Sequence, residues 1–124
     1  MILDAGALIA VSRNDRAMIA RLVVAEQEGD ELRTHAMVVA QVWREHRGRQ
    51  APLARLLRAV EVVAVDDHLG RRSGELLGKA RTSDPIDAAV VLIATDGEAV
   101  ATSDPDDILH LARTAKRRLL VLRC

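Results

Sequence analysis

The residues of this chain best suited to chemistry are aspartates that recur in one repeated motif. The tetrapeptide Thr-Ser-Asp-Pro begins at Thr82 and again at Thr102, and in each copy a second aspartate follows the first after three residues. The aspartates concerned are Asp84, Asp87, Asp104 and Asp107. The stretch 82–112 holds seven acidic side chains and no Lys or Arg. Because carboxylates gathered without cations repel one another, a bound divalent metal ion is the usual means of stabilising such a group.

Strand and helix patterns alternate along the whole sequence. Strands are predicted at 1–3, 32–34, 62–65, 99–102 and 119–122. Helices are predicted at 5–11, 16–28, 36–46, 52–60 and 66–79, and two more begin at Asp84 and Asp104, each with Pro at the first helical position. This alternation predicts an α/β fold in which a parallel sheet is covered on both faces, with 1–124 as one domain.

Two details of packing follow from the same patterns. In the helix 36–46 we expect Val38, Val39, Val42 and Trp43 to point inward. In the helix 66–79, glycines recur every fourth residue at Gly70, Gly74 and Gly78. We expect these glycines to allow close helix packing.

The repeated aspartates have a structural and a chemical interpretation. In the structural one, the first aspartate of each copy caps a helix and the second complements the positive end of the helix dipole. In the chemical one, Asp4 and Asp104 each end a strand, and ligand sites in parallel sheets lie at those ends. Asp87 lies in the first turn of the helix that precedes the strand 99–102. If the two strands are neighbours, the three carboxylates meet at one edge, where their oxygens suit Mg²⁺ or Mn²⁺.

The composition narrows the class of protein further. Apolar residues make up 49% of the chain and aromatic residues 1%, so the core must be aliphatic. The single cysteine, Cys124, cannot form an internal disulfide, which favours a reduced, cytoplasmic compartment. No secretory signal is expected, and the longest apolar run, 88–94, is too short to cross a membrane. The histidines show no zinc-binding spacing.

With these motifs in this order, the chain resembles the PIN-domain ribonucleases, in particular the VapC-type toxins of bacterial toxin–antitoxin pairs. The resemblance rests on Ile2-Leu-Asp4 before an apolar helix, on Ile86-Asp87-Ala-Ala, and on Thr102-Ser-Asp104-Pro-Asp-Asp107-Ile. It implies a three-layer α/β/α sandwich with a central parallel sheet. It also implies that Asp4, Asp87 and Asp104 bind Mg²⁺ or Mn²⁺, with Asp107 as a supporting carboxylate.

Two positions depart from the family pattern. The family normally has a glutamate where this chain has Gln41, in the context Val-Val-Ala-Gln-Val, and an amide brings neither charge nor a base. Glu45 follows one helical turn later and is either a substitute for that glutamate or a surface partner of neighbouring arginines. Gly6 stands where many relatives have a small hydroxyl residue.

The function implied by the resemblance is hydrolysis of RNA phosphodiester bonds, with a 5′-phosphate on one product. The metal would lower the pKa of an attacking water and stabilise the leaving oxygen. Thr102 or Ser103 would hydrogen-bond a ligating carboxylate. The arginines expected to contact RNA phosphates are Arg13, Arg44, Arg47 and Arg49, and the lack of aromatics argues against base stacking.

The resemblance also implies a VapB-like antitoxin partner and a homodimer. The helices at 17–24 and 52–60 would supply the antitoxin groove, although core packing explains their apolar faces equally well. Because of Gln41, a PIN-like module that binds a protein or RNA without cleavage remains the alternative. A phosphoacceptor receiver domain, which has a similar length and sheet, is excluded because Asp4 lacks an acidic neighbour and no lysine lies near Ser103.

Overall fold

A computed structural model describes residues 1–44 and 48–124 of the chain. Glu45 and Arg47 therefore lie outside the described residues, as does the end of the helix predicted at 36–46. The strands in the described part are β1 (Ile2–Leu3), β2 (Arg33–His35), β3 (Glu61–Val63), β4 (Ala99–Thr102) and β5 (Leu120–Arg123). They pair in parallel in the order β3-β2-β1-β4-β5, so each predicted strand is confirmed to within two residues.

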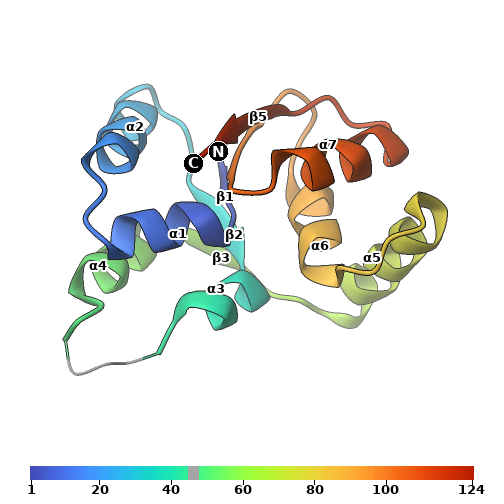
Figure 1. Cartoon of the computed structure of the whole chain (residues 1–124), viewed down its shortest axis with the longest axis horizontal. Coiled ribbons are helices and arrows are strands. Elements are labelled where there is room, and N and C mark those ends of the chain that lie inside the picture. Colours follow the sequence, from blue (N-terminus) through green and yellow to red (C-terminus); the bar gives the residue numbers. More distant parts are fainter. Residues whose placement is uncertain (45–47) are drawn as a thin grey trace.

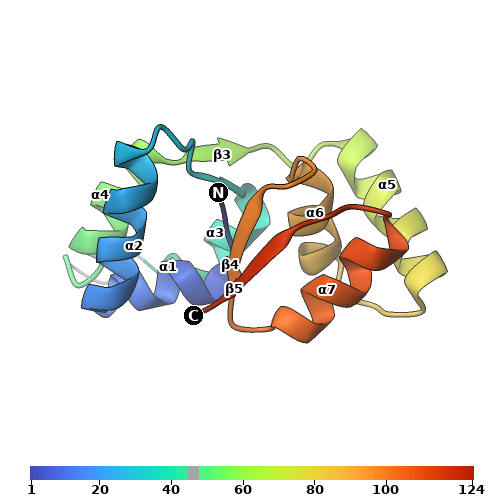
Figure 2. The same cartoon turned by 90° about the horizontal axis from the view of Figure 1, so that it is seen from above.

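Helices cover both faces of this sheet (Figure 1). One layer contains α1 (Ala5–Ser12), α2 (Arg16–Gln27), α3 (Ala36–Val42) and α4 (Ala51–Ala59). The other contains α5 (Asp67–Ala80), α6 (Pro85–Ile93) and α7 (Pro105–Thr114). Within each layer the helices pack on one another, and the view from above in Figure 2 shows the strands running between the two groups. The predicted three-layer sandwich is confirmed.

An aliphatic core lies between the sheet and each helical layer. Both residues of β1 are fully buried, as expected for a central strand of a parallel sheet. Helix α6 is apolar nearly all round because it packs against α5, α7 and β2. None of the helices in the described ranges is both long and apolar enough to span a bilayer.

The order in which the chain adds strands to the sheet reverses at β1. From β1 the chain proceeds outward to β2 and β3, whereas β4 and β5 lie on the other side of β1. Strands β1 and β4 are hydrogen-bonded neighbours, with Ile2 opposite Val100 and Leu3 opposite Ala101. In sheets of this kind, a crevice for ligands lies at the carboxyl ends of the strands where the order reverses.

Two packing predictions were wrong. Trp43 follows the end of α3 in extended backbone and is 37% exposed, so it points outward, whereas Val38 and Val42 are buried as expected. A Cβ atom added at Gly70, Gly74 or Gly78 would meet no atom within 4 Å. These glycines therefore face open space, and no helix approaches them closely.

Candidate carboxylate site

Asp4 is fixed at the carboxyl end of β1 by hydrogen bonds to both of its side-chain oxygens. Its Oδ1 accepts the backbone N–H of Ala5 at 2.8 Å, which caps α1, and its Oδ2 accepts the hydroxyl of Thr102 at 2.7 Å. Its own N–H donates to the carbonyl of Ala101 at 3.0 Å and continues the β1–β4 pairing. With 4% of its surface exposed, this carboxylate is held in one orientation.

Thr102, the last residue of β4, positions two acidic residues at once. While its hydroxyl donates to Asp4, the same oxygen accepts the backbone N–H of Asp104 at 3.0 Å. The side chain of Thr102 is fully buried. The predicted hydrogen bond from Thr102 to an acidic side chain is thus confirmed, and it is much shorter than that from Ser103 to Asp104, at 3.4 Å.

Asp87 has the most perturbed carboxyl group of the site. Asp84 caps α6 by accepting the N–H groups of Ile86 and Asp87 at 2.9 and 3.2 Å, and this places Asp87 in the first turn. Burial, followed by the charges of four other carboxylates, raises the pKa of Asp87 to about 7. In descending order these are Asp84, Asp4, Asp104 and Asp107. The predicted carboxylates are therefore close enough to interact electrostatically.

The capping interpretation is correct for one copy of the repeat and wrong for the other. Asp84 caps α6 as predicted, but the side chain of Asp104 makes no capping hydrogen bond to α7. The backbone differs at the two residues: Asp84 is extended, with φ −89° and ψ 102°, whereas Asp104 has φ −119° and ψ 62°. The carboxylate of Asp104 is exposed and has only the long contact from Ser103.

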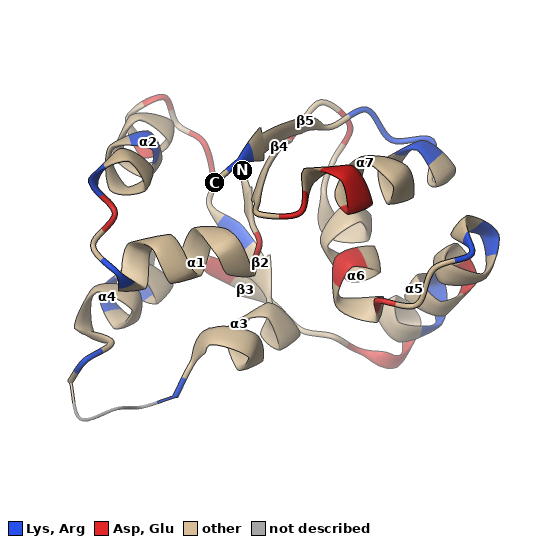
Figure 3. Ribbon diagram, viewed as in Figure 1, with Lys and Arg blue, Asp and Glu red and all other residues tan. Residues whose placement is uncertain are grey.

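Figure 3 shows the first turns of α6 and α7 in red on the side of the molecule that faces the end of β1. No three His, Cys, Asp or Glu side chains among the residues described come close enough together to form a metal-binding group as they stand. The donor set nevertheless fits a hard divalent cation, since it consists of carboxylates whose mutual repulsion helps to raise the pKa of Asp87. Asp4, Asp87 and Asp104 are the residues that would hold such an ion.

His35 was missed by the sequence reasoning, which tested histidines only for zinc spacing. It is fully buried, its Nε2 donates to the carbonyl of Ile86 at 2.9 Å, and its Nδ1 accepts the N–H of Met37 at 3.2 Å. These bonds fix the neutral tautomer with the proton on Nε2, and burial lowers the pKa of His35. The residue joins the start of α3 to the first turn of α6, beside Asp87. The sequence signal that could have identified His35 is its position between the end of a predicted strand and the start of a predicted helix.

Gly6 has a steric explanation. A Cβ atom at this position would come within 2.9 Å of the Cβ, N and Oγ atoms of Ser103. The second Thr-Ser-Asp-Pro copy therefore lies directly against the first turn of α1. A side chain at this position would not fit unless the neighbouring atoms moved, so the glycine at position 6 and the close approach of Ser103 belong together.

The other predicted site residues make no hydrogen bond to the carboxylates within the described part of the chain, or lie outside it. Gln41 is exposed in the last turn of α3, and its side chain makes no hydrogen bond within the described part of the chain. Arg13 ends α1, at the opposite end of that helix from Asp4. Arg44 donates from Nη1 to the carbonyls of Ala40 and Trp43 at 2.9 and 2.7 Å, which caps the end of α3. The assignment of these arginines to RNA stays a prediction.

A parallel sheet in the order β3-β2-β1-β4-β5 between two helical layers has the PIN-like α/β architecture. A solved structure with this arrangement is that of VapBC2 from Rickettsia felis bound to a DNA fragment from their promoter. A chain in it matches 97% of this chain over 96% of its own length, with a TM-score of 0.68 and 13% identity. At that identity the likeness shows the fold alone. No protein-family model and no curated protein sequence matches this chain.

Proposed function

We propose that this protein is a metal-dependent endoribonuclease and the toxin component of a VapBC-type pair. The observation that carries the proposal is the geometry at the ends of β1 and β4, where Thr102 donates to Asp4 at 2.7 Å and accepts the N–H of Asp104 at 3.0 Å. Burial and the neighbouring carboxylates also raise the pKa of Asp87 to about 7. These carboxylates gather where the strand order reverses, which is where ligands bind in sheets of this topology. The PIN-like fold supports the same conclusion.

Within this proposal, the residues of the chain have distinct tasks. Asp4, Asp87 and Asp104 would hold Mg²⁺ or Mn²⁺, whose chemistry is to lower the pKa of water and to stabilise the leaving oxygen of the phosphodiester. Thr102 fixes the orientation of Asp4 and the backbone at Asp104. Asp84 fixes the first turn of α6, and Asp107, in the first turn of α7, supports the group electrostatically.

The decisive experiment is an RNA cleavage assay on protein purified free of any partner. Wild-type protein should cleave mixed RNA with Mn²⁺ and should lose cleavage in EDTA. Asp4→Asn should lower the rate at least about a hundredfold, because metal stabilisation of the reaction amounts to several kcal/mol. Cleavage that survives EDTA or the substitution would show that the carboxylates are not a metal-dependent active site.

The alternative is a PIN-like module that binds without cleaving, and Gln41 is the residue that favours it. Gln41 is exposed on α3 and brings no charge to the carboxylates. If Gln41→Glu gains cleavage relative to wild type, the amide attenuates a working nuclease. If neither protein cleaves RNA with Mn²⁺ but both bind a partner, the binding module is the correct function.

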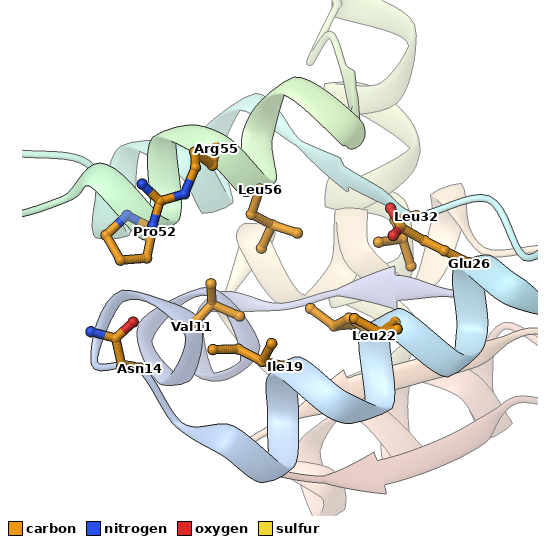
Figure 4. A pocket seen from close by; sticks show the side chains of 10 residues that line it. Val11, Asn14, Ile19, Leu22, Glu26, Leu32, Pro52, Arg55 and Leu56 are labelled. Atoms are coloured by element: carbon orange, nitrogen blue, oxygen red, sulfur yellow. The ribbon is translucent and has the colours of Figure 1, made fainter.

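A groove in the helical layer that contains α1, α2 and α4 supports an antitoxin partner (Figure 4). It has a volume of about 220 Å³ and lies between α1, α2 and α4, and α2 and α4 are the helices expected to supply an antitoxin groove. Its lining residues are Val11, Asn14, Ile19, Leu22, Val23, Glu26, Leu32, Pro52, Arg55 and Leu56. An apolar floor with Glu26 and Arg55 among the lining residues suits an amphipathic helix.

The groove offers its own test through two adjacent, similarly exposed valines. Val23 lines the groove and is 45% exposed, whereas Val24 does not line it and is 50% exposed. Val23→Asp should abolish copurification with the cognate antitoxin, and Val24→Asp should leave it intact, with cleavage unchanged in both. Equal copurification of the two variants would place the antitoxin elsewhere.

Homodimerisation remains part of the proposal on the strength of the resemblance. Met37 and Trp43 place exposed apolar surface at the start and just past the end of α3. Sedimentation velocity of wild type and Trp43→Arg would test it. A dimer that dissociates in the variant would place the interface there, whereas a monomeric wild type would remove homodimerisation from the proposal.

A further inference from the structure

We propose that a basic pocket between α5, α6 and α7 binds a phosphate group. The pocket has a volume of about 350 Å³ and is separate from both the carboxylates and the antitoxin groove. Its charged lining residues are Arg72, Glu75, Lys79, Lys116 and Arg117. In Figure 3 the C-terminal ends of α5 and α7 and the segment after α7 are blue, whereas the first turns of α6 and α7 are red.

The cations of this pocket are largely without partners. Arg72, Lys79 and Lys116 make no ion pair or hydrogen bond from their side chains in the described part of the chain, while Arg117 donates to the carbonyl of Ala94. Lys79 and Lys116 are also the only lysines in the sequence, which otherwise uses arginine as its cation, and both line this one pocket. Cations held close together without partners repel, and a bound anion offsets that repulsion.

Helix dipoles do not account for so much positive charge. The C-terminal ends of α5, α6 and α7 lie near this pocket, and each end carries about half a negative charge. Together with the carboxylate of Glu75, they offset roughly two and a half of the four positive charges. The pocket therefore keeps a net positive charge of more than one, which is available to a ligand.

The shape and lining of the pocket suit phosphate. Leu76 is 5% exposed and Leu92 half-buried, so both provide an apolar floor that strengthens the attraction between charges above it. Lys79 and Lys116 offer compact ammonium donors, and Arg72 offers a planar guanidinium fork that matches phosphate oxygens. The volume is large enough to admit a phosphate together with an attached nucleoside.

The phosphate has two possible sources, RNA backbone and a free phosphorylated molecule. From Asp87 to Leu92, α6 advances about 7.5 Å, and from Asp107 to Thr114, α7 advances about 10 Å. These lengths correspond to about two or three phosphates of a nucleic acid strand. An RNA held at the carboxylates therefore reaches the pocket within a few nucleotides. The RNA case rests on the proposed nuclease function, whereas the free phosphate case does not.

Amine labelling tests the pocket directly because the lysines are so few. Wild-type protein in EDTA, which prevents metal-dependent cleavage, is treated with an amine-reactive ester, and labelling is read by mass spectrometry. Single-stranded RNA, a nucleoside monophosphate and inorganic phosphate are compared with sodium chloride at equal ionic strength. We expect at least about a threefold slowing at Lys79 and Lys116 with phosphate-bearing ligands, since bound phosphate neutralises and covers the ammonium groups.

Each result of the labelling experiment has one meaning. Protection by RNA alone identifies the backbone as the source, and protection by the monophosphate or by inorganic phosphate identifies a free molecule. Labelling that is the same with every phosphate compound as with chloride overturns the proposal. Metal-dependent cleavage by the same preparation, with unprotected lysines, would overturn the pocket while leaving the nuclease function intact.

A pair of double variants provides the second measurement. Lys79→Gln/Lys116→Gln removes two charges from the pocket, and Arg16→Gln/Arg58→Gln removes two from exposed positions on α2 and α4. The pocket variant should weaken binding of the ligand that gives protection about three- to tenfold. If that ligand is RNA, the slope of log Kd against log salt should fall by about 1.4, or 0.7 per phosphate contact. The control variant should change binding less than about twofold. Equal weakening in both variants would show that the overall charge of the protein, and not the pocket, determines binding, and would overturn the proposal.

Discussion

The two copies of Thr-Ser-Asp-Pro have one sequence and two structural roles. In the first copy Thr82 is exposed, and Asp84 caps α6 by accepting two backbone N–H groups. In the second copy Thr102 is fully buried at the end of β4, and Asp104 caps nothing with its side chain. The same four residues thus build a helix start in one place and the edge of the carboxylate site in the other.

What precedes each copy accounts for the difference. The first copy follows α5 and Arg81, whose left-handed backbone ends that helix and leads into an exposed loop. The second copy begins inside β4, so the pairing of β4 with β1 brings Thr102 beside Asp4. A short motif therefore takes its role from the element that delivers it, and equivalent substitutions in the two copies should have unequal effects.

The largest difference is expected for the two threonines. Thr102→Val keeps the volume but leaves the buried carboxylate of Asp4 without its hydroxyl donor and the N–H of Asp104 without its acceptor. We expect the free energy of unfolding to fall by about 2–3 kcal/mol. Thr82→Val, on an exposed side chain, should change it by less than about 0.5 kcal/mol. Urea unfolding at pH 7 measures both, and equal losses would show that the two copies are not different.

Ser103, the serine of the second copy, lies against Gly6 on α1. Gly6→Ala should destabilise the fold by about 1–3 kcal/mol, because the new methyl group overlaps Ser103. Gly70→Ala adds the same methyl group in the open interior of α5 and should stabilise by about 0.5–1 kcal/mol. Thermal unfolding of both variants checks the signs. Ser103→Gly should recover part of the Gly6→Ala loss, and a lack of recovery would argue against this contact.

The first aspartates of the two copies, Asp84 and Asp104, should differ less in their effect on the free energy of unfolding. Asp84→Ala removes two hydrogen bonds to the first turn of α6 and should cost about 1 kcal/mol. Asp104→Ala removes no cap and relieves repulsion, so its effect on the free energy of unfolding should stay within about 0.5 kcal/mol. Urea unfolding in the absence of divalent ions is the measurement. A larger loss of stability for Asp104→Ala than for Asp84→Ala would contradict the assignment of the capping role to Asp84.

Asp87 should make the stability of the protein depend on pH. Its pKa is raised from 3.8 to about 7 in the folded protein, so the folded state binds more protons between these values and stability falls as pH rises through that window. Asp87→Asn should remove this fall and be more stable than wild type at pH 7.5 by on the order of 1 kcal/mol, allowing for partial exposure. At pH 4 the two proteins should be equally stable.

Two comparisons isolate the effect of Asp87 from other titrations. The pKa of His35 is lowered by burial, so its contribution is present above pH 6.5 and is lost as pH falls below it. Wild type and Asp87→Asn share this contribution, and it cancels in their difference. Asp107→Asn changes the equivalent exposed aspartate of the second copy and should show no comparable gain at pH 7.5. A constant difference between wild type and Asp87→Asn from pH 4 to pH 7.5 would contradict the raised pKa.

Much of the fold could be predicted from the sequence because the local patterns of strands and helices agree with the topology of the sheet. The alternation of strands and helices gave the parallel sheet, and the position of Asp4 and Asp104 after strands anticipated the edge at which they gather. The strand prediction at 99–102 matches β4, whose ends are marked by Gly97 and by the second motif copy. These features depend on neighbours in sequence, which sequence reasoning can evaluate.

The features that were missed depend on contacts between distant segments. His35 hydrogen-bonds to the carbonyl of Ile86, and Gly6 lies against Ser103. Helix periodicity also predicted that Trp43 points inward, but α3 ends at Val42, so Trp43 lies outside the helix in extended backbone. Each of these outcomes requires knowing which strands are neighbours and where a helix stops, and short motifs do not carry that information.

The central claim is that the two copies contribute different aspartates to one divalent metal site. Mn²⁺ binding, followed by titration calorimetry or by the electron paramagnetic resonance signal of free Mn²⁺, tests it in Asp84→Asn, Asp87→Asn and Asp104→Asn. Asparagine retains the capping of α6 at position 84, so the fold is preserved in that control. We predict that Asp87→Asn and Asp104→Asn weaken Mn²⁺ binding at least about tenfold, while Asp84→Asn stays within about twofold of wild type. Wild type that binds no Mn²⁺, or Asp84→Asn that loses as much affinity as Asp87→Asn, would contradict the claim.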